Sequence, residues 1–299
     1  MSSEAKPTAA STSRSALPLR VGLQYETNDP IDVQRAVWRI ADEAGFDQIW
    51  NSDHLVRPPS SGNVAGPILD SWTALAAQAQ ATRRIRIGVL VTANLLRHPA
   101  LLAKVATTVD HISGGRVEVG LGTGWNEAAF TMLGMPFAEA PERGRRLGEA
   151  AAVLKALWTQ ERANFSGRYY QLKDAIAEPK PVQKPHPPLM IGGRGPVVTL
   201  RVAATHGDAW NTSGGRGFDV DLETVRLLDQ HCLKVGRDPK TLRRSVIIPW
   251  TKAEDALASA KRYWDAGFTE FLIPVTDADS PRQVEILARE ALPRLRAIG

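Results

Sequence analysis

The chain alternates between short apolar segments and longer segments that place an apolar residue every three or four positions. The short segments are rich in β-branched and aliphatic residues and are bounded by turn-forming residues, which is typical of buried parallel strands. The longer segments have the 3.6-residue period of amphipathic helices. Strands are predicted at residues 19–25, 48–51, 85–92, 116–122, 189–192, 209–212, 245–250 and 270–275. Helices are predicted at about 31–44, 70–82, 99–111, 143–159, 196–206, 219–236, 252–266 and 280–297.

Strand and helix segments follow one another in eight units, which predicts an α/β fold closed as a (β/α)₈ TIM barrel. Local signals support several helix boundaries. Asp29-Pro30 is expected to cap the first helix, and Gly45, Gly207 and Gly267 are expected to end three helices in the left-handed conformation that glycine tolerates.

One connection interrupts this rhythm, between the fourth and fifth strands. Residues from about 160 to 187 contain a hairpin-like stretch at 163–170 and then a proline-rich run to Pro188. An insertion of this length is expected to act as a lid or as an oligomer contact. The barrel domain is expected to span residues 18–299, after a disordered Ser-, Ala- and Thr-rich tail at residues 1–17 that lacks the apolar core of a signal peptide.

Composition narrows the function classes. A net charge of +5 is modest, and the basic residues lie on amphipathic helices without interleaved aromatic residues, so nucleic-acid binding is not expected. No apolar stretch approaches the roughly 20 residues of a membrane helix. The single cysteine, Cys232, excludes a disulfide framework and fits a reducing cytoplasm. No His-x-His, His-Glu-x-x-His or Cys-x-x-Cys motif occurs, so no metal site is expected. A small-molecule substrate remains as the expected partner.

The barrel architecture sorts the candidate chemical groups, because catalytic residues of such barrels lie on the loops that follow strands. His54 follows the second predicted strand, whereas the other histidines lie before strands, within a helix, or, for His98, at a helix start. An imidazole at the barrel mouth can act as acid, base or hydrogen-bond donor, although a loop histidine satisfied by backbone is an equal alternative. Asp53, beside it, is expected to orient it or to contact a cofactor.

Two glycine-containing segments also follow strands. The fourth strand leads into Gly122, Thr123, Gly124, Trp125 and Asn126, where the glycines would let a planar group approach the backbone beside an aromatic side chain. The fifth strand leads into Gly192, Gly193, Arg194 and Gly195 ahead of a helix. Free amide groups, the helix dipole and a guanidinium favour a phosphate there over a plain tight turn.

Other barrel chemistries have less support. No lysine ends a strand, which argues against a Schiff-base aldolase. Glu26 and Glu127 both follow strands, so a glycosidase with paired carboxylates is conceivable, but it would leave the Gly-Arg segment unexplained.

Several motifs together resemble a known family. They are the stretches at 41–47 (ADEAGFD), 52–55 (SDHL), 97–104 (RHPALLAK), 113–116 (SGGR) and 122–127 (GTGWNE), followed by those at 179–183 (PKPVQ), 191–193 (IGG) and 207–211 (GDAWN). In this order they resemble the luciferase-like monooxygenase superfamily, and within it the branch of coenzyme F420-dependent oxidoreductases.

The resemblance implies a flavin or deazaflavin enzyme, commonly a homodimer, that holds its ring at the barrel mouth. It implies a non-prolyl cis peptide near Val89 and Leu90 behind the ring, with Thr92 and Asn94 at the ring edge and the cofactor phosphate at residues 193–195. Hydride transfer between F420 and an organic substrate would follow, with His54 as proton donor or ring-positioning group. The sugar-phosphate dehydrogenases of the family carry an acidic residue where this chain has Trp125, so a sugar phosphate is not the expected substrate.

Two alternatives remain open from the sequence. One is a monooxygenase that uses reduced flavin mononucleotide (FMN) and oxygen on the same fold. The other is a protein that binds a flavin or deazaflavin without turnover.

Overall fold

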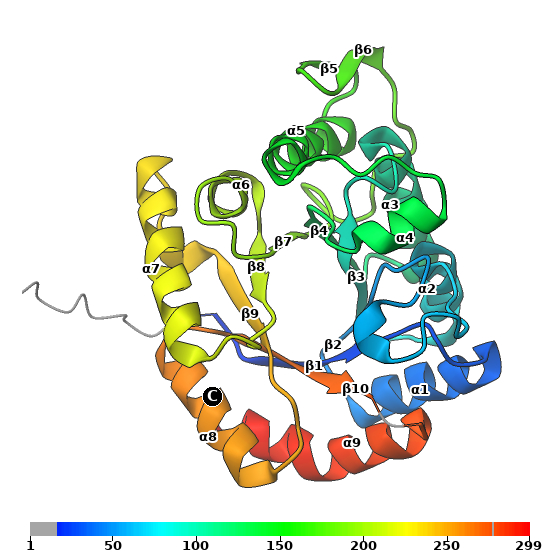
Figure 1. Cartoon of the computed structure of the whole chain (residues 1–299), viewed down its shortest axis with the longest axis vertical. Coiled ribbons are helices and arrows are strands. Elements are labelled where there is room, and N and C mark those ends of the chain that lie inside the picture. The colour runs from blue at the N-terminus through cyan, green and yellow to red at the C-terminus, as the bar shows by residue number, and fades with distance from the viewer. Residues whose placement is uncertain (1–16, 277) are drawn as a thin grey trace, which may run out of the picture.

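The barrel is closed and entirely parallel. The computed structural model describes residues 17–276 and 278–299, so the predicted tail lies, apart from Leu17, outside the described residues. Neighbouring strands follow the order β1-β10-β9-β8-β7-β4-β3-β2 around the ring (Figure 1). Their bounds are β1 (Arg20–Tyr25), β2 (Gln48–Asn51), β3 (Arg86–Ala93), β4 (Val117–Gly122), β7 (Leu189–Gly192), β8 (Ala209–Thr212), β9 (Arg243–Ile247) and β10 (Glu270–Val275). The prediction of a TIM barrel is confirmed.

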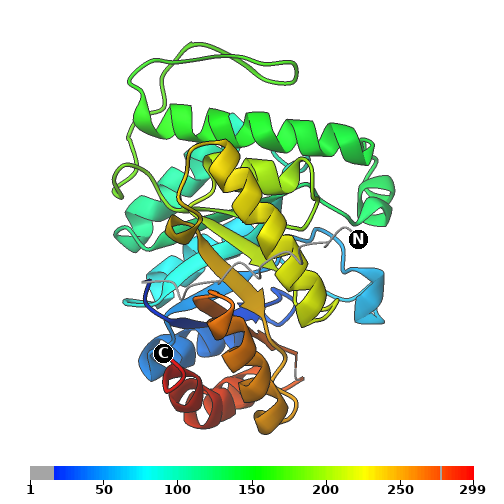
Figure 2. The ribbon, with the colours of Figure 1, turned by 90° about the vertical axis from the view of Figure 1, so that its left-hand side faces the viewer.

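Helices surround the strands and bury the apolar faces that the sequence pattern predicts (Figures 1 and 2). They are α1 (Ile31–Ala44), α2 (Ser71–Ala81), α3 (Pro99–Ser113), α4 (Glu127–Met132), α5 (Ala140–Thr159), α6 (Thr199–His206), α7 (Phe218–Lys234), α8 (Ala253–Asp265) and α9 (Ser280–Arg296), with short 3₁₀ helices at Pro59–Ser61 and Pro239–Thr241. Among the described residues, no helix has the length and apolar character needed to cross a membrane.

Some predicted boundaries are wrong for identifiable reasons. β9 spans Arg243–Ile247, so it begins two residues earlier than predicted and also ends earlier. The predicted end is too late because apolar residues continue beyond Ile247 into the following loop. Helix α4 was not predicted, since its six residues are too few to show a helical period. Gly45 and Gly267 adopt the expected positive φ of 84° and 85°, whereas Gly207 is extended, with φ of −74°.

The predicted cap at Asp29 is also wrong. α1 has no side-chain cap, and the carboxylate of Asp29 instead accepts hydrogen bonds from the hydroxyls of Tyr25, at 2.7 Å, and Ser280, at 2.8 Å. Asp29 therefore ties the end of β1 to the start of α9, which closes the barrel between its first and last units.

The insertion after β4 contains an antiparallel hairpin, β5 (Ala163–Ser166) and β6 (Gln171–Ala175), which projects beyond α5 (Figures 1 and 2). The carboxylate of Glu149 in α5 accepts hydrogen bonds from the backbone amides of residues 168, 169 and 170 at the hairpin turn. The hairpin packs on α5, and none of its residues lines the cavity at the barrel mouth, so a role as lid or oligomer contact stays a prediction.

The N-terminal end of the barrel is closed by buried charges. The carboxylate of Glu118 contacts the guanidinium groups of Arg20 at 2.9 Å, Arg243 at 2.7 Å and Arg86, and Arg243 also reaches Glu270 at 2.6 Å. Burial alone would raise the pKa of Glu118, but the three guanidinium groups outweigh it and lower the pKa to about 2. Glu118 is therefore a carboxylate at neutral pH, compensated within the cluster.

Candidate active site

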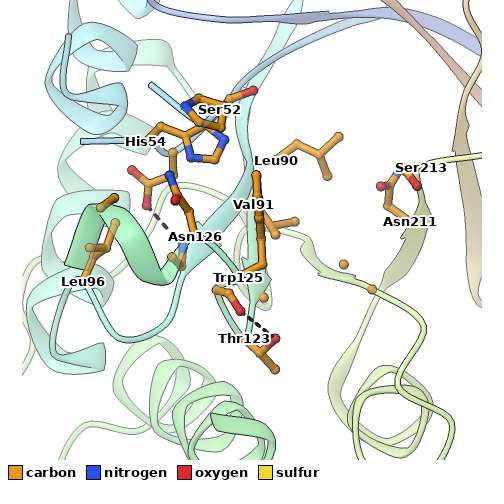
Figure 3. Close-up of a pocket in the computed structure, with 18 of the residues that line it drawn as sticks. Ser52, His54, Leu90, Val91, Leu96, Thr123, Trp125, Asn126, Asn211 and Ser213 are labelled. Atoms are coloured by element: carbon orange, nitrogen blue, oxygen red, sulfur yellow. Dashed lines mark hydrogen bonds between the residues drawn. The ribbon is translucent and has the colours of Figure 1, made fainter. Parts of the chain in front are cut away.

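A cavity of about 720 Å³ lies at the C-terminal ends of the strands, opposite the charged cluster. Many of the predicted site residues line this cavity, and they lie on the loops after β2, β4 and β7 and on β3. They are Asp53, His54, Leu90, Gly122, Thr123, Gly124, Trp125, Asn126, Gly192, Gly193, Arg194 and Gly195. Figure 3 shows that Leu90 and Val91 lie between His54 on one side and Asn211 with Ser213 on the other.

Strand β3 carries the predicted bulge and cis peptide, one residue later than expected. The non-prolyl cis bond joins Leu90 to Val91, and the pairing register with β4 shifts between Val89 and Thr92. The shift lets two consecutive side chains, Leu90 and Val91, both face the cavity, and it reverses the alternation of the residues that follow.

Three predicted cofactor contacts do not line the cavity: Val89, which precedes the bulge, and Thr92 and Asn94, which follow it. Val89 is fully buried in the layer between strands and helices. The hydroxyl of Thr92 accepts a hydrogen bond from Trp72 Nε1 in α2 at 2.9 Å. Asn94 is 3 % exposed, and its amide donates to the hydroxyl of Tyr170 at 3.3 Å. A regular alternation would point Thr92 inward, and the bulge turns it outward.

Glycines around the bulge make room for Val91. A methyl group on Gly122 would lie 2.5 Å from Cγ2 of Val91, and one on Gly192 would lie 2.7 Å from Cγ1. The prediction that Gly122 lets a planar group approach the backbone directly needs correction, since the space is filled by Val91. Val91 forms the floor that a planar group would meet. Gly124 is needed for another reason, its positive φ of 77°.

Asp53 is held rigidly at the edge of this floor. Its Oδ2 accepts hydrogen bonds from the backbone amide of Ala93 at 3.2 Å and from Arg97 Nη1 at 2.7 Å. Its Oδ1 is buried and has no partner among the described residues. Burial raises the pKa of Asp53 against the opposing effect of Arg97, so the carboxyl is costly to ionise. A buried oxygen with no partner at a cavity wall is available to a ligand.

His54 lies next to Trp125, with ring centroids 5.7 Å apart and planes at 86°. Burial lowers the pKa of His54, although Glu26 and Asp53 act in the opposite direction. The imidazole is therefore neutral near pH 7, where one nitrogen can accept a proton and the other can donate a hydrogen bond. Asn126 extends the same wall, and its buried Nδ2 has no partner among the described residues.

The Gly-Arg segment lies on the other side of the cavity. The guanidinium of Arg194 is 3.1 Å from Oδ1 of Asp221, a fully buried residue of α7 that also accepts hydrogen bonds from Thr212 and Tyr263. The amide of Gly193 was expected to be free, but it donates a hydrogen bond to the carbonyl of Asn211 at 3.1 Å. The amides of Arg194 and Gly195 donate to no acceptor among the described residues and remain available.

Several lining residues were not among the predicted site residues. They include Gln24, Glu26, Ser52, Leu55, Leu96, Phe130, Leu133, Asn211, Ser213 and Arg216. Ser213 and Arg216 follow β8, so the rule that chemistry follows strands identifies them in retrospect. Leu133 and Phe130 depend on α4, which the sequence did not reveal. Glu127 does not line the cavity, which removes the carboxylate pair that a glycosidase would need.

The fold and cavity are those of a (β/α)₈-barrel enzyme whose site lies at the C-terminal ends of the strands. A model of the luciferase-like monooxygenase family matches residues 13–293. The chain belongs to this family, and it is an oxidoreductase.

Named relatives are similar over most of the chain. An uncharacterized protein of Mycobacterium tuberculosis is 34 % identical over 287 residues, covering 90 % of this chain and 98 % of the relative. An F420-dependent glucose-6-phosphate dehydrogenase of Microbacterium testaceum is 35 % identical over 260 residues, covering 83 % of this chain and 73 % of the relative.

Solved structures share the fold at lower identity. An F420-dependent secondary alcohol dehydrogenase in complex with an F420-acetone adduct has a TM-score of 0.80 at 20 % identity, covering 93 % of this chain and 99 % of the other. A long-chain alkane monooxygenase, LadA, has a TM-score of 0.76 at 15 % identity, covering 94 % and 92 %.

Proposed function

We propose that the protein is an F420-dependent oxidoreductase that transfers a hydride between the deazaflavin and a small organic substrate. The observation that carries the proposal is the arrangement of the cavity. Leu90 and Val91 form a floor between His54 on one side and Asn211 with Ser213 on the other (Figure 3), and the Gly-Arg loop at Arg194 lines the same cavity. Relatives named as F420-dependent dehydrogenases support the choice of cofactor.

The residues present fit such a cofactor on two counts. The buried Oδ1 of Asp53 and Nδ2 of Asn126, an acceptor and a donor, have no partners among the described residues and lie at the wall of the cavity. On the other side, Arg194 and the unpaired amides of residues 194 and 195 would hold a phosphate. A bound deazaflavin would supply a hydride acceptor or donor.

The protein's own chemistry is proton handling and positioning. When a substrate carbon loses a hydride, the proton of its hydroxyl group must also leave, and the neutral imidazole of His54 can take it. In the reverse direction the protonated imidazole of His54 donates the proton to a carbonyl oxygen and returns to its neutral form. Trp125 packs against the imidazole edge and restricts its orientation. The loop that carries His54 is fixed through Asp53, because the carboxylate of Asp53 accepts hydrogen bonds from the backbone amide of Ala93 and from Arg97.

The test is a cofactor titration of the purified protein with F420 and, separately, with FMN, followed by ligand fluorescence. Binding of F420, with its reduction or reoxidation by alcohol and carbonyl compounds, is expected. Tight FMN binding without F420 binding, together with oxygen consumption, would support a monooxygenase instead. F420 binding with no turnover across a broad panel of alcohols, ketones, enones and imines would favour a carrier protein.

A further inference from the structure

The two sides of the cavity differ in chemistry. The side formed by the ends of β7 and β8 is polar and basic, and its lining residues include Arg194, Asn211, Thr212, Ser213 and Arg216. The side formed by the loops after β2, β3 and β4 is largely apolar, with Leu55, Leu96, Trp125, Ala129, Phe130 and Leu133. In Figure 3, Leu96 and His54 lie on the side away from Asn211 and Ser213.

The apolar side has no free cation. Among its described lining residues the titratable groups are Glu26, Asp53 and His54, and neither lysine nor arginine occurs. Arg97 lies behind this wall, but its guanidinium is taken by Asp53, at 2.7 Å, and by Asp70. A phosphate placed here would meet acidic groups and lack a compensating charge, which is strongly unfavourable in a partly desolvated site.

Apolar side chains also remain exposed at this rim. Trp125 is 61 % exposed and Leu133 is 47 % exposed, although both line the cavity. Large apolar side chains that face a cavity and stay accessible are typical of ligand-binding surfaces. Because the ring of Trp125 contacts that of His54, an apolar group packed on Trp125 would hold the reacting atom beside the imidazole.

We propose that the substrate is an uncharged alcohol or carbonyl compound whose non-reacting part is an aliphatic or aromatic group, bound against Trp125 and Leu133. The inference rests on the proposed function, because it assigns the basic side to the cofactor phosphate and leaves the apolar rim at Trp125 and Leu133 to the substrate. It excludes sugar phosphates as substrates of this chain. The polar contacts of the substrate are limited to its reacting oxygen at His54.

The experiment compares homologous series on the F420-loaded protein, with straight-chain 2-alkanols tested against oxidised cofactor and the matching 2-ketones against reduced cofactor. Burial of each added methylene is expected to raise kcat/KM by about three- to fourfold until the wall is covered. Glucose 6-phosphate, at the same concentrations, is expected to give no turnover.

A matched pair of variants tests the location. Leu133 lines the cavity, whereas its neighbour Met132 is 63 % exposed and does not. Leu133→Arg is expected to lower kcat/KM for the longest alcohols by at least about tenfold and to flatten the dependence on chain length. Met132→Arg is expected to leave both unchanged. F420 affinity is expected to stay the same in both variants.

Failure of this inference and failure of the proposed function give different results. If F420 binds and turns over but glucose 6-phosphate is preferred, or chain length has no effect, the apolar substrate class is wrong and the function stands. If F420 does not bind, the function is wrong. The inference is then decided by calorimetric titration of the free protein with the same 2-alkanol series. An affinity that does not depend on chain length overturns it.

Discussion

Ionisable side chains occur at both ends of the barrel, but the two ends use them differently. At the N-terminal end, Glu118 and Glu270 contact three arginines within one cluster. At the mouth, Glu26, His54 and Arg216 form no ion pair with any described residue, although all three line the cavity. Charge at the closed end is compensated internally and serves the fold. The open end also holds ion pairs, at Asp53 with Arg97 and at Arg194 with Asp221, but it leaves Glu26 and Arg216 for a ligand. Substitutions at the two ends should therefore separate stability from activity.

The largest effect on stability is expected from Arg243→Met, because it leaves two buried carboxylates short of a partner. Removing one member of a buried ion cluster costs about 3–5 kcal/mol. Urea denaturation should show this loss while F420 affinity stays unchanged. The control is Arg226→Met, since Arg226 and Glu223 are both more than half exposed and should give no detectable change. Unaltered stability in Arg243→Met would remove the distinction between the two ends.

His54→Ala should produce the opposite pattern. Loss of the proton-transferring group is expected to lower kcat by about 10²–10⁴-fold, with little change in the midpoint of urea unfolding. His111→Ala, at the far end of α3 and outside the cavity, is the matched control. Steady-state turnover with the preferred alcohol provides the measurement. Full activity without His54 would assign the proton to another group.

Arg194→Ala should weaken F420 binding by about 1–3 kcal/mol through the loss of a charge-assisted hydrogen bond to phosphate. Fluorescence titration gives the dissociation constant, and thermal unfolding monitors the effect of losing the Arg194–Asp221 pair. Arg201→Ala, on the same side of the barrel in α6 but outside the cavity, is the control. Equal affinity in both variants would place the phosphate elsewhere.

The smallest effect concerns the pH profile. Alcohol oxidation needs neutral His54, so activity falls as the pH drops through the pKa of His54, which burial holds below its usual value. Glu26 raises this pKa, so Glu26→Gln should lower it and shift the acidic limb of the kcat/KM profile to lower pH. Glu127→Gln, which lies outside the cavity, should leave the limb in place. An acidic limb that stays in place in Glu26→Gln, as in the control, would show that Glu26 does not act on His54.

The sequence determined the barrel and most of its mouth. Strand and helix periods are local properties, and eight alternating units have one common closed arrangement, so the fold followed from the pattern. The rule that chemistry follows strands then selected Asp53, His54 and Arg194, all of which line the cavity.

Tertiary structure alone decided which neighbours on one strand face the cavity. The bulge at Leu90 and Val91 reversed the alternation of β3, so the side chains of Thr92 and Asn94 do not face the cavity and Gly122 makes room for Val91. The sequence does not reveal such a bulge, because it depends on pairing with β4 and has no period of its own. The pairing of Arg194 with Asp221 likewise depends on segments that are far apart in the sequence. The place of Leu133 on the cavity wall depends on α4, a helix too short to predict. Local pattern fixes elements, whereas contacts between elements fix the direction of each side chain.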